Sequence, residues 1–204
     1  MATETRPTKR RYEKRARAAQ EHATRLRVIE AAMELHGTVG PARTTISAIA
    51  ARAGVRRATV YRHFRDERAL FLGCSGVWRD RHPVPDPATW SAIADPAARL
   101  EAALGALYAW YEEAAPMLSA LLRDIEAMPI IAELQAGRQA YLADVEDGLA
   151  SGWGIRGHAA KRLRATIGIA LDFFTWRTLD ERGLGRSDAV AVMSSAVRAA
   201  AATT

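Results

Sequence analysis

Apolar residues recur at intervals of three and four positions along almost the whole chain, and this spacing constrains the fold more than any other feature. Ile46, Ile49, Ala50 and Ala53 follow it, for example. Such spacing places apolar side chains on one face of a helix. No segment of useful length alternates apolar and polar residues, as a half-buried strand would. The sequence therefore predicts an all-α fold of about nine helices.

Glycine, proline and capping residues indicate where these helices begin and end. A helix over about 22–36 should stop at Gly37, and a second should start from a cap at Thr44 or Thr45 and stop at Gly54. A third should span about 57–64. Later helices are expected from a cap at Asp66 to the proline-rich stretch at 83–87, and then over about 96–115, 116–127, 129–151, 158–181 and 187–201, the last capped by Ser187.

Positive charge is concentrated in the first part of the chain. Residues 1–82 hold 18 Lys and Arg against 8 Asp and Glu, a net charge of +10, whereas residues 83–204 hold 11 against 15, a net charge of −4. This asymmetry points to a polyanionic partner for the first part only. We expect a basic flexible arm at 1–21, a polyanion-binding domain at 22–68 and a second domain at 69–204.

The arm is basic and has almost no large apolar residue, so it cannot bury enough surface to fold alone. Its later part can extend the first helix. Such an arm can reach along DNA phosphates or into a minor groove. The alternative is a tail that only keeps the protein in solution.

The two short helices around Gly54 form a helix-turn-helix pattern. In the second of these helices Val60 and Phe64 face inward. The polar residues of this helix point elsewhere, and they are Arg57, Thr59, Arg62 and His63. A helix with one polar edge fits the major groove of DNA. The alternative is a helix-turn-helix that serves only as a structural corner.

The run TTISAIAARAGVRRATVYRHF, from Thr44 to Phe64, resembles the signature of the tetracycline-repressor (TetR) family, and VIEAAMEL, from Val28 to Leu35, resembles the family's first helix. The resemblance covers about residues 25–72. It implies a three-helix DNA-binding domain followed by a helical domain that binds a ligand and dimerises. The DNA-binding residues that it implies are Thr44, Thr45, Arg56, Arg57, Ala58, Thr59, Tyr61, Arg62 and His63.

By this resemblance Thr44 and Thr45 meet phosphates, and the start of the third helix touches base edges. There Arg57 can pair with a guanine, while Ala58 or Thr59 can touch a thymine methyl group. Tyr61 and His63 match positions that contact the DNA backbone, and Arg62 suits either task.

Three positions depart from the family pattern. Arg56 stands where a capping Ser is common and cannot cap in that way, although it can add a phosphate contact. Glu67 stands where a basic residue is usual, so the phosphate contact expected there is in doubt. His36 replaces an aromatic residue, and a packed, neutral side chain is the preferred interpretation over a pH sensor.

In the larger domain the resemblance implies a ligand pocket, with a mainly apolar or aromatic ligand expected from the residues available. The candidate lining residues are Trp78, Tyr108, Trp110, Tyr111, Met117, Leu121, Ile125, Asp172, Phe173, Phe174 and Trp176. Aromatic residues at helical spacing are more often plain core. Asp172 stands in an apolar stretch, where a carboxylate needs a partner or water.

The resemblance also implies a homodimer formed through the last two helices, at about 158–181 and 187–201. We expect an apolar face and small residues there, and a two-fold dimer would read a palindromic operator. The proposed face comprises Ile167, Leu171, Val190, Met193 and Val197, with Ala189, Ala196, Ala199 and Ala200 as the small residues.

An enzyme is not expected. The five His are scattered, Cys74 is the only cysteine, and phosphate-binding or nucleophile motifs are absent from the sequence. We expect no cofactor and no metal, and no apolar run reaches the roughly 20 residues of a membrane span. With one cysteine and no signal sequence, a cytoplasmic location is the default.

The sequence therefore predicts a sequence-specific transcription regulator, a repressor that a small ligand releases from its operator. The alternative is a constitutive DNA-binding regulator without an effector.

Overall fold

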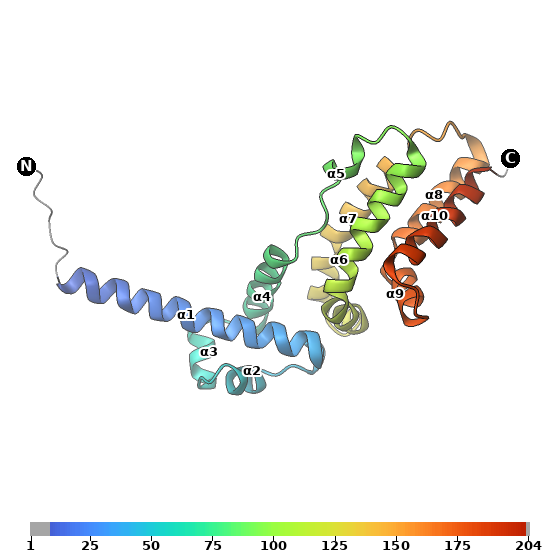
Figure 1. The fold of residues 1–204 in the computed structure, drawn as a ribbon. Coiled ribbons are helices and arrows are strands. Elements are labelled where there is room, and N and C mark those ends of the chain that lie inside the picture. Colours follow the sequence, from blue (N-terminus) through green and yellow to red (C-terminus); the bar gives the residue numbers. More distant parts are fainter. Residues whose placement is uncertain (1–8, 203–204) are drawn as a thin grey trace, which may run out of the picture. The chain divides into compact units, whose positions relative to one another are not determined.

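The computed structural model describes residues 9–202, and every regular element in this range is helical (Figure 1). The all-α prediction is confirmed. The elements are α1 (Lys9–Thr38), the 3-10 turn η1 (Pro41–Arg43), α2 (Ile46–Arg52), α3 (Arg57–His63), α4 (Glu67–Arg81), α5 (Ala88–Ser91), α6 (Pro96–Asp124), α7 (Pro129–Ala150), α8 (Gly157–Leu171), α9 (Phe173–Glu181) and α10 (Arg186–Ala202).

Contacts divide the chain into two compact units, Met1–Arg81 and His82–Thr204. The first unit holds α1 to α4 and the second holds α5 to α10. The division groups α4 with the helix-turn-helix segment. None of the described helices has both the length and the apolar character that a membrane crossing requires.

In the first unit the C-terminal half of α1 packs against α2, α3 and α4. Val28, Ile29 and Ala32 of α1 are buried there, as are Ile49 of α2 and Leu70 of α4. This shared apolar core holds the short helices α2 and α3, which could not form stably by themselves.

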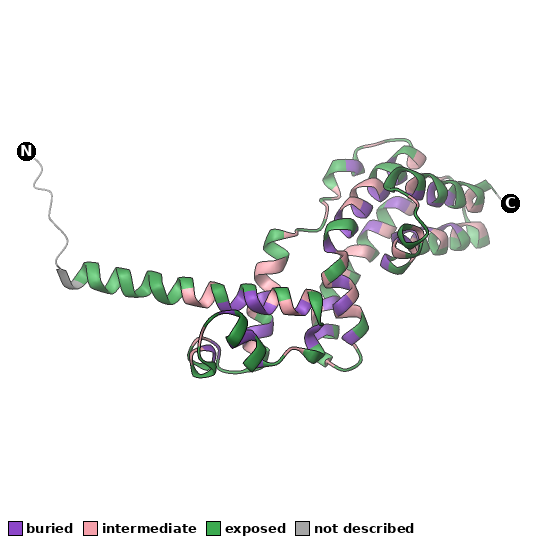
Figure 2. Cartoon of the chain, turned by 60° about the horizontal axis from the view of Figure 1, so that its bottom comes forward, coloured by how far each residue is buried: buried purple, intermediate pink, exposed green. Residues whose placement is uncertain are grey.

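Helix α1 begins at Lys9, well before the expected start near residue 22. Residues 9–21, the later part of the expected arm, are helical and extend the first helix, while residues 1–8 of that arm lie outside the described residues. Every side chain from 11 to 23 is exposed (Figure 2). Ala, Arg, Lys, Glu and Gln dominate this stretch and favour a helix without a packing partner, and Arg17 pairs with Glu21 one turn later, at 3.4 Å.

The second unit is built on α6, whose buried residues include Leu100, Leu104 and Tyr111. Helices α7, α8, α9 and α10 all pack against it. The helix start predicted at Pro116 is wrong, because α6 continues through this residue to Asp124. Pro116 is exposed, so the carbonyl group that loses its hydrogen-bond partner there can be solvated by water.

The single helix predicted over 158–181 is also wrong, because the chain breaks at Asp172 between α8 and α9. The backbone of Asp172 is extended, with φ −72° and ψ 136°. Its carboxylate accepts hydrogen bonds from the backbone N–H groups of Phe174 at 2.8 Å and Thr175 at 3.1 Å. Asp172 therefore acts as the N-cap of α9, and the partner that its charge required is the helix end.

We expect Asp172→Ala to lower the free energy of unfolding by about 0.5–2 kcal/mol, the usual cost of losing an N-cap. Urea unfolding of the full chain measures this loss. Asp180→Ala, in the last turn of α9, removes the same charge without removing a cap and should cost less. Equal losses in the two variants would contradict the capping role.

Ser187 was expected to cap the last helix, but α10 begins at Arg186 and Ser187 lies inside its first turn. The expected dimer face needs a larger correction. Ile167, Leu171, Met193 and Val197 are at most 8% exposed within one chain, so they form the core of the second unit and cannot meet a partner.

Candidate nucleic-acid interface

Helix α2 is set by a cap at one end and by its apolar face. The hydroxyl of Thr45 accepts a hydrogen bond from the backbone N–H of Ala48 at 3.1 Å. Of the two threonines predicted as possible caps, Thr45 is therefore the N-cap of α2. The hydroxyl of Thr44 instead donates to the carbonyl of Gly40 at 2.8 Å and is partly buried. Thr45 is exposed at the start of α2, while Thr44 is half-buried.

The turn between α2 and α3 depends on Gly54, whose φ of +65° lies in the left-handed region. Glycine adopts this conformation without the strain that a Cβ atom would bring. The backbone N–H of Val55 donates to the carbonyl of Ala50 at 2.9 Å and closes the end of α2. The turn thus sets the direction in which α3 leaves α2.

Helix α3 has one buried face and one exposed face, as the sequence predicted. Val60 is 1% exposed, and Phe64, directly after the helix, is 3% exposed. The predicted DNA-binding residues of α3 lie around the rest of its surface: Arg57, Ala58, Tyr61 and Arg62 are exposed, and Thr59 and His63 are half-buried. The exposed set forms one continuous surface with Arg56 at its beginning.

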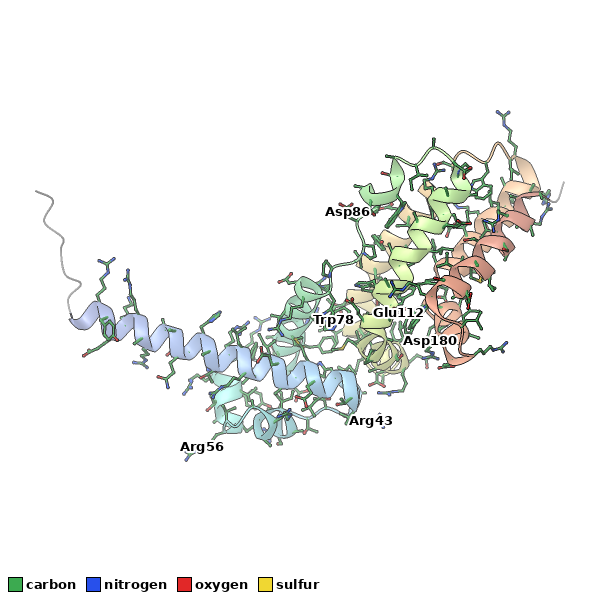
Figure 3. The ribbon with its side chains drawn as sticks, in the orientation of Figure 1. Arg43, Arg56, Trp78, Asp86, Glu112 and Asp180 are labelled. Carbon is green, nitrogen blue, oxygen red and sulfur yellow. The ribbon has the colours of Figure 1, made fainter. Side chains whose placement is uncertain are left out.

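Arg56 occupies the N-cap position of α3 but makes no side-chain cap, as expected for an arginine. Its side chain is exposed and extends away from the helices (Figure 3). Arg57 lies against the next turn of α3, where its Nη2 donates to the hydroxyl of Tyr61 at 3.3 Å. Its guanidinium is 5.6 Å from the centre of the Tyr61 ring. Both guanidinium groups are thus available at the exposed surface of α3.

Arg25 of α1 holds the end of α3, a role that the sequence analysis missed. Its Nη1 donates to the carbonyl of His63 at 3.1 Å, and its guanidinium lies 4.2 Å from the centre of the Phe64 ring. Cations favour the carbonyl end of a helix and the face of an aromatic ring. Helical spacing could have predicted this contact, because Arg25 precedes the buried residues Val28 and Ile29 by three and four positions and so lies on the same face of α1.

His63 is limited as a DNA contact. Its Nε2 is buried and has no hydrogen-bond partner among the described residues. Burial, with smaller effects from Arg62 and Arg25, lowers the pKa of His63. The side chain is therefore favoured in its neutral form, and only Nδ1 remains for a contact with the DNA backbone. Glu67, the departure expected to weaken a phosphate contact, is exposed in the first turn of α4.

His36 is packed inside the first unit. Its ring lies 5.2 Å from the Phe71 ring, and its Nδ1 is 3.5 Å from the Sγ of Cys74. Burial lowers the pKa of His36 to about 4. A neutral imidazole thus takes the place of the aromatic residue that the family resemblance leads one to expect.

This burial predicts a loss of stability in acid. Between pH 6.5 and about 4 the unfolded chain binds a proton that folded His36 does not, so stability is complete above pH 6.5 and falls as the pH drops toward 4. The contribution of this residue is up to about 3 kcal/mol. Urea unfolding at pH 7 and pH 4.5 measures the loss, and His36→Phe should make it smaller. An unchanged pH dependence in this variant would assign the effect to other groups.

The candidate ligand residues lie in different surroundings. Tyr108, Trp110, Tyr111, Phe173 and Trp176 form a buried aromatic cluster in the second unit, with ring centres 5.3 Å apart for Tyr111 and Phe173. Met117, Leu121 and Ile125 are half-buried on α6 and at its end, Asp172 and Phe174 are exposed, and Trp78 lies in α4 of the first unit.

The hydroxyl groups of the cluster are satisfied within the protein. Tyr108 donates to the carbonyl of Ala170 at 2.8 Å, and Tyr111 donates to the carbonyl of Leu171 at 2.6 Å. These are carbonyl groups at the C-terminal end of α8, next to the break at Asp172. The two tyrosines therefore join α6 to the end of α8.

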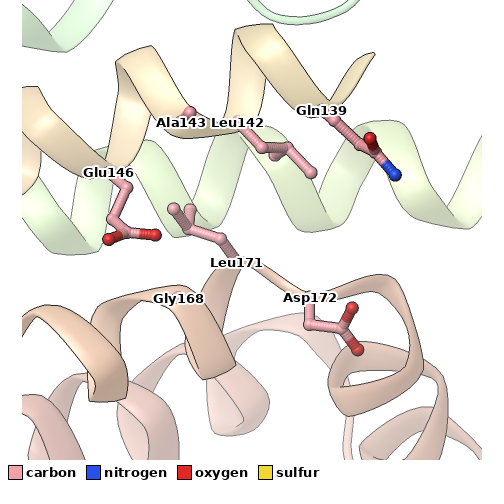
Figure 4. A pocket seen from close by; sticks show the side chains of 7 residues that line it. All are labelled: Gln139, Leu142, Ala143, Glu146, Gly168, Leu171 and Asp172. Carbon is pink, nitrogen blue, oxygen red and sulfur yellow. The ribbon is translucent and has the colours of Figure 1, made fainter. Parts of the chain in front are cut away.

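An open groove of about 210 Å³ lies between α7 and α8 (Figure 4). It is lined by Gln139, Leu142, Ala143, Glu146, Gly168, Leu171 and Asp172. Of these only Asp172 was among the predicted ligand residues. No sequence pattern pointed to the others, because a groove between two helices depends on how the helices pack.

Among the described residues, no group of three or more His, Cys, Asp and Glu side chains is placed to hold a metal ion. No curated protein matches the sequence significantly. Residues 28–74, however, match the model of the bacterial regulatory proteins of the tetR family. This match includes α2, α3 and the buried half of α1.

Solved structures extend the likeness to most of the chain. A TetR-like transcriptional regulator from Rhodococcus sp. RHA1 is 17% identical, with a TM-score of 0.64 over 88% of this chain and 97% of that one. A Clostridium perfringens protein, described as a candidate regulator of fatty acid metabolism, is 16% identical, with a TM-score of 0.61 over 87% and 100% of the two chains.

At these identities the likeness shows the fold alone, while the match at 28–74 shows the DNA-binding domain of a family of regulators that are not enzymes. Residues 28–74 thus match the DNA-binding domain of the tetR family of bacterial regulatory proteins, and the chain as a whole has the helical fold of TetR-like transcriptional regulators.

Proposed function

We propose that the protein is a repressor that binds a palindromic operator as a homodimer, with α3 of each subunit in a major groove. The observation that carries this proposal is the surface of α3, where exposed polar residues stand opposite the buried Val60 and Phe64. The major groove is wide enough to admit a helix of this kind. The family's role in DNA-binding regulation supports the proposal.

Within this proposal the start of α3 reads bases and the surrounding residues bind phosphates. Arg57 offers two parallel N–H donors to the O6 and N7 atoms of a guanine, and Ala58 is small enough to approach a thymine methyl group. Thr45, at the exposed N-terminus of α2, is suited to a phosphate, because the free N–H groups of a helix start attract anions. Arg56, Tyr61 and Arg62 add further backbone contacts.

The homodimer is proposed to form through α8 and α10. With the expected face buried as core, the exposed apolar residues of these helices take its place: Ile169 is 55% exposed and Val192 is 46% exposed. The exposed Ala196 and Ala199 on α10 allow close approach of a second helix. A two-fold dimer presents two α3 helices and so requires two half-sites in inverted repeat.

Release of the operator by a small ligand is the finer part of the proposal. The buried aromatic cluster and the groove between α7 and α8 meet at Leu171 and Asp172, so a mainly apolar or aromatic ligand could act on the join between α8 and α9. The likeness to a candidate fatty acid regulator makes an acyl chain one class to test. The alternative remains a constitutive regulator whose cluster is only core.

The experiment that tests the proposal is selection of bound sequences from a pool of random duplexes. We expect an inverted repeat with half-sites at least one helical turn apart. Binding to the selected duplex is then measured with medium- and long-chain fatty acids and with simple aromatic acids. A ligand that weakens binding supports release, and binding unaffected by every acid favours the constitutive alternative. If the bound duplexes shared no sequence and resembled the starting pool, this result would contradict the proposal as a whole.

A further inference from the structure

The N-terminal half of α1 projects beyond the helix-turn-helix core. Buried side chains on α1 begin only at Val28, and all side chains from 11 to 23 are exposed (Figure 2). Residues 11–23 form about 20 Å of helix at 1.5 Å per residue. This length of ordered helix packs against no other described element.

The face of α1 that packs on the core continues along the projection. Arg25, Val28 and Ala32, spaced three and four residues apart, point toward α3 and the core. The same spacing carried toward the N-terminus reaches Lys14 and Arg11, through Ala18 and Glu21. The projecting face on the α3 side is therefore the one that bears Lys14 and Arg11.

Two more basic residues border this row. Arg15 follows Lys14 directly, and Arg17 lies on its other side, paired with Glu21. Between residues 11 and 23 the opposite face instead carries Tyr12, alanines at 16, 19 and 23, and, at its edge, Glu13 and Gln20. The positive charge of residues 11–23 thus lies on the same side of α1 as Arg25, which contacts the end of α3.

We infer that this projecting helix lies along duplex DNA outside the half-site read by α3, with Arg11, Lys14 and Arg15 against its phosphates. The inference rests on the proposed function, because it requires α3 to face DNA. From Arg25, which contacts the end of α3, to Lys14 is about 16 Å along the helix, so the projection passes beyond the bases that α3 can reach. The partner of this basic face is double-stranded DNA of any sequence, since phosphate contacts carry no base preference.

Charge and composition favour DNA over other partners. A helix that inserts into a membrane surface needs a broad apolar face, and a coiled coil needs apolar residues in its seam. Here the seam positions hold Arg11, Lys14 and Glu21, and the opposite face has Tyr12 as its only large apolar side chain between residues 11 and 23. A row of cations continuous with a DNA-reading helix complements a polyanion.

The test uses the full-length protein and two forms of the selected operator, one ending at the half-sites and one with about ten further base pairs, near one helical turn, of arbitrary sequence on each side. The variant Arg11→Gln/Lys14→Gln/Arg15→Gln removes three charges and keeps residues that favour a helix. We expect the wild-type protein to bind the longer duplex more tightly and this variant to bind both duplexes equally.

The salt dependence gives the size of the effect. Three lost phosphate contacts should lower the slope of log affinity against log salt by about 2.7, at about 0.9 per contact. The affinity difference between wild type and variant on the longer duplex should then shrink by about 40-fold between 50 and 200 mM salt. An unchanged slope would overturn the inference.

A matched control separates the face from the total charge. The variant with the three glutamines plus Tyr12→Lys, Ala16→Lys and Ala19→Lys has the wild-type net charge but carries it on the opposite face. We expect it to behave as the glutamine variant does, with helix content confirmed by circular dichroism. Wild-type behaviour would overturn the inference, whereas loss of all preference among duplexes by the wild-type protein itself would refute the proposed function instead.

Discussion

Arg57→Ala is expected to weaken binding to the selected operator by about 1–3 kcal/mol and to relax the preference for one base pair in each half-site. Arg57 stands in the first turn of α3, exposed and held over the helix surface by Tyr61. A guanidinium in this position can make two parallel hydrogen bonds to a guanine, which alanine cannot replace. Binding to single-base variants of the operator measures both effects.

The neighbouring residue gives a matched control. Arg56 is also exposed but extends away from α3, so Arg56→Ala should weaken binding to specific and random duplexes by similar factors. The same uniform loss in Arg57→Ala would mean that Arg57 contacts only phosphate. The base-reading role would then pass to Ala58, Thr59 or Arg62.

Phe64→Ala is expected to destabilise the first unit by about 3–5 kcal/mol, the usual cost of removing a buried aromatic ring. Phe64 is 3% exposed and packs beneath the guanidinium of Arg25. It also touches α4 closely, since a Cβ atom at Gly73 would lie 3.2 Å from its ring. Its loss leaves a cavity where α1, α3 and α4 meet, so α3 should lose its position and DNA binding should fall.

Hydrogen exchange followed by mass spectrometry locates this effect. Peptides of α1 to α4 should exchange faster in Phe64→Ala, while peptides of α6 to α10 should be unchanged. Leu72→Ala, in the same unit but 41% exposed, is the control and should leave exchange nearly unaltered. Unchanged protection of α3 in Phe64→Ala would show that α3 is held by other contacts.

The helix-turn-helix could be predicted from the sequence because its determinants are local. The cap at Thr45, the positive φ of Gly54 and the inward spacing of Val60 and Phe64 all act within a few residues of one another. Such signals depend little on the rest of the fold. The non-capping Arg56 was predicted for the same reason.

The second unit was less predictable because its signals are compatible with several arrangements. The helical spacing of apolar residues continues across Asp172, so periodicity predicted one unbroken helix. In the structure the Asp172 carboxylate instead accepts hydrogen bonds from the N–H groups of Phe174 and Thr175 and interrupts the helix. Pro116 suggested a helix start, but an exposed proline within a long, well-packed helix is tolerated.

By itself the amino-acid sequence determined that the chain is helical, that its basic end carries a helix-turn-helix, and that polar side chains of α3 lie opposite its apolar edge. Only the tertiary structure decided that Ile167 and Val197 are core while Ile169 and Val192 face outward, and that Arg25 contacts the end of α3. The reason is physical: caps, turns and periodicity arise from neighbours along the chain. What a helix face packs against depends on residues that meet only when the chain is folded.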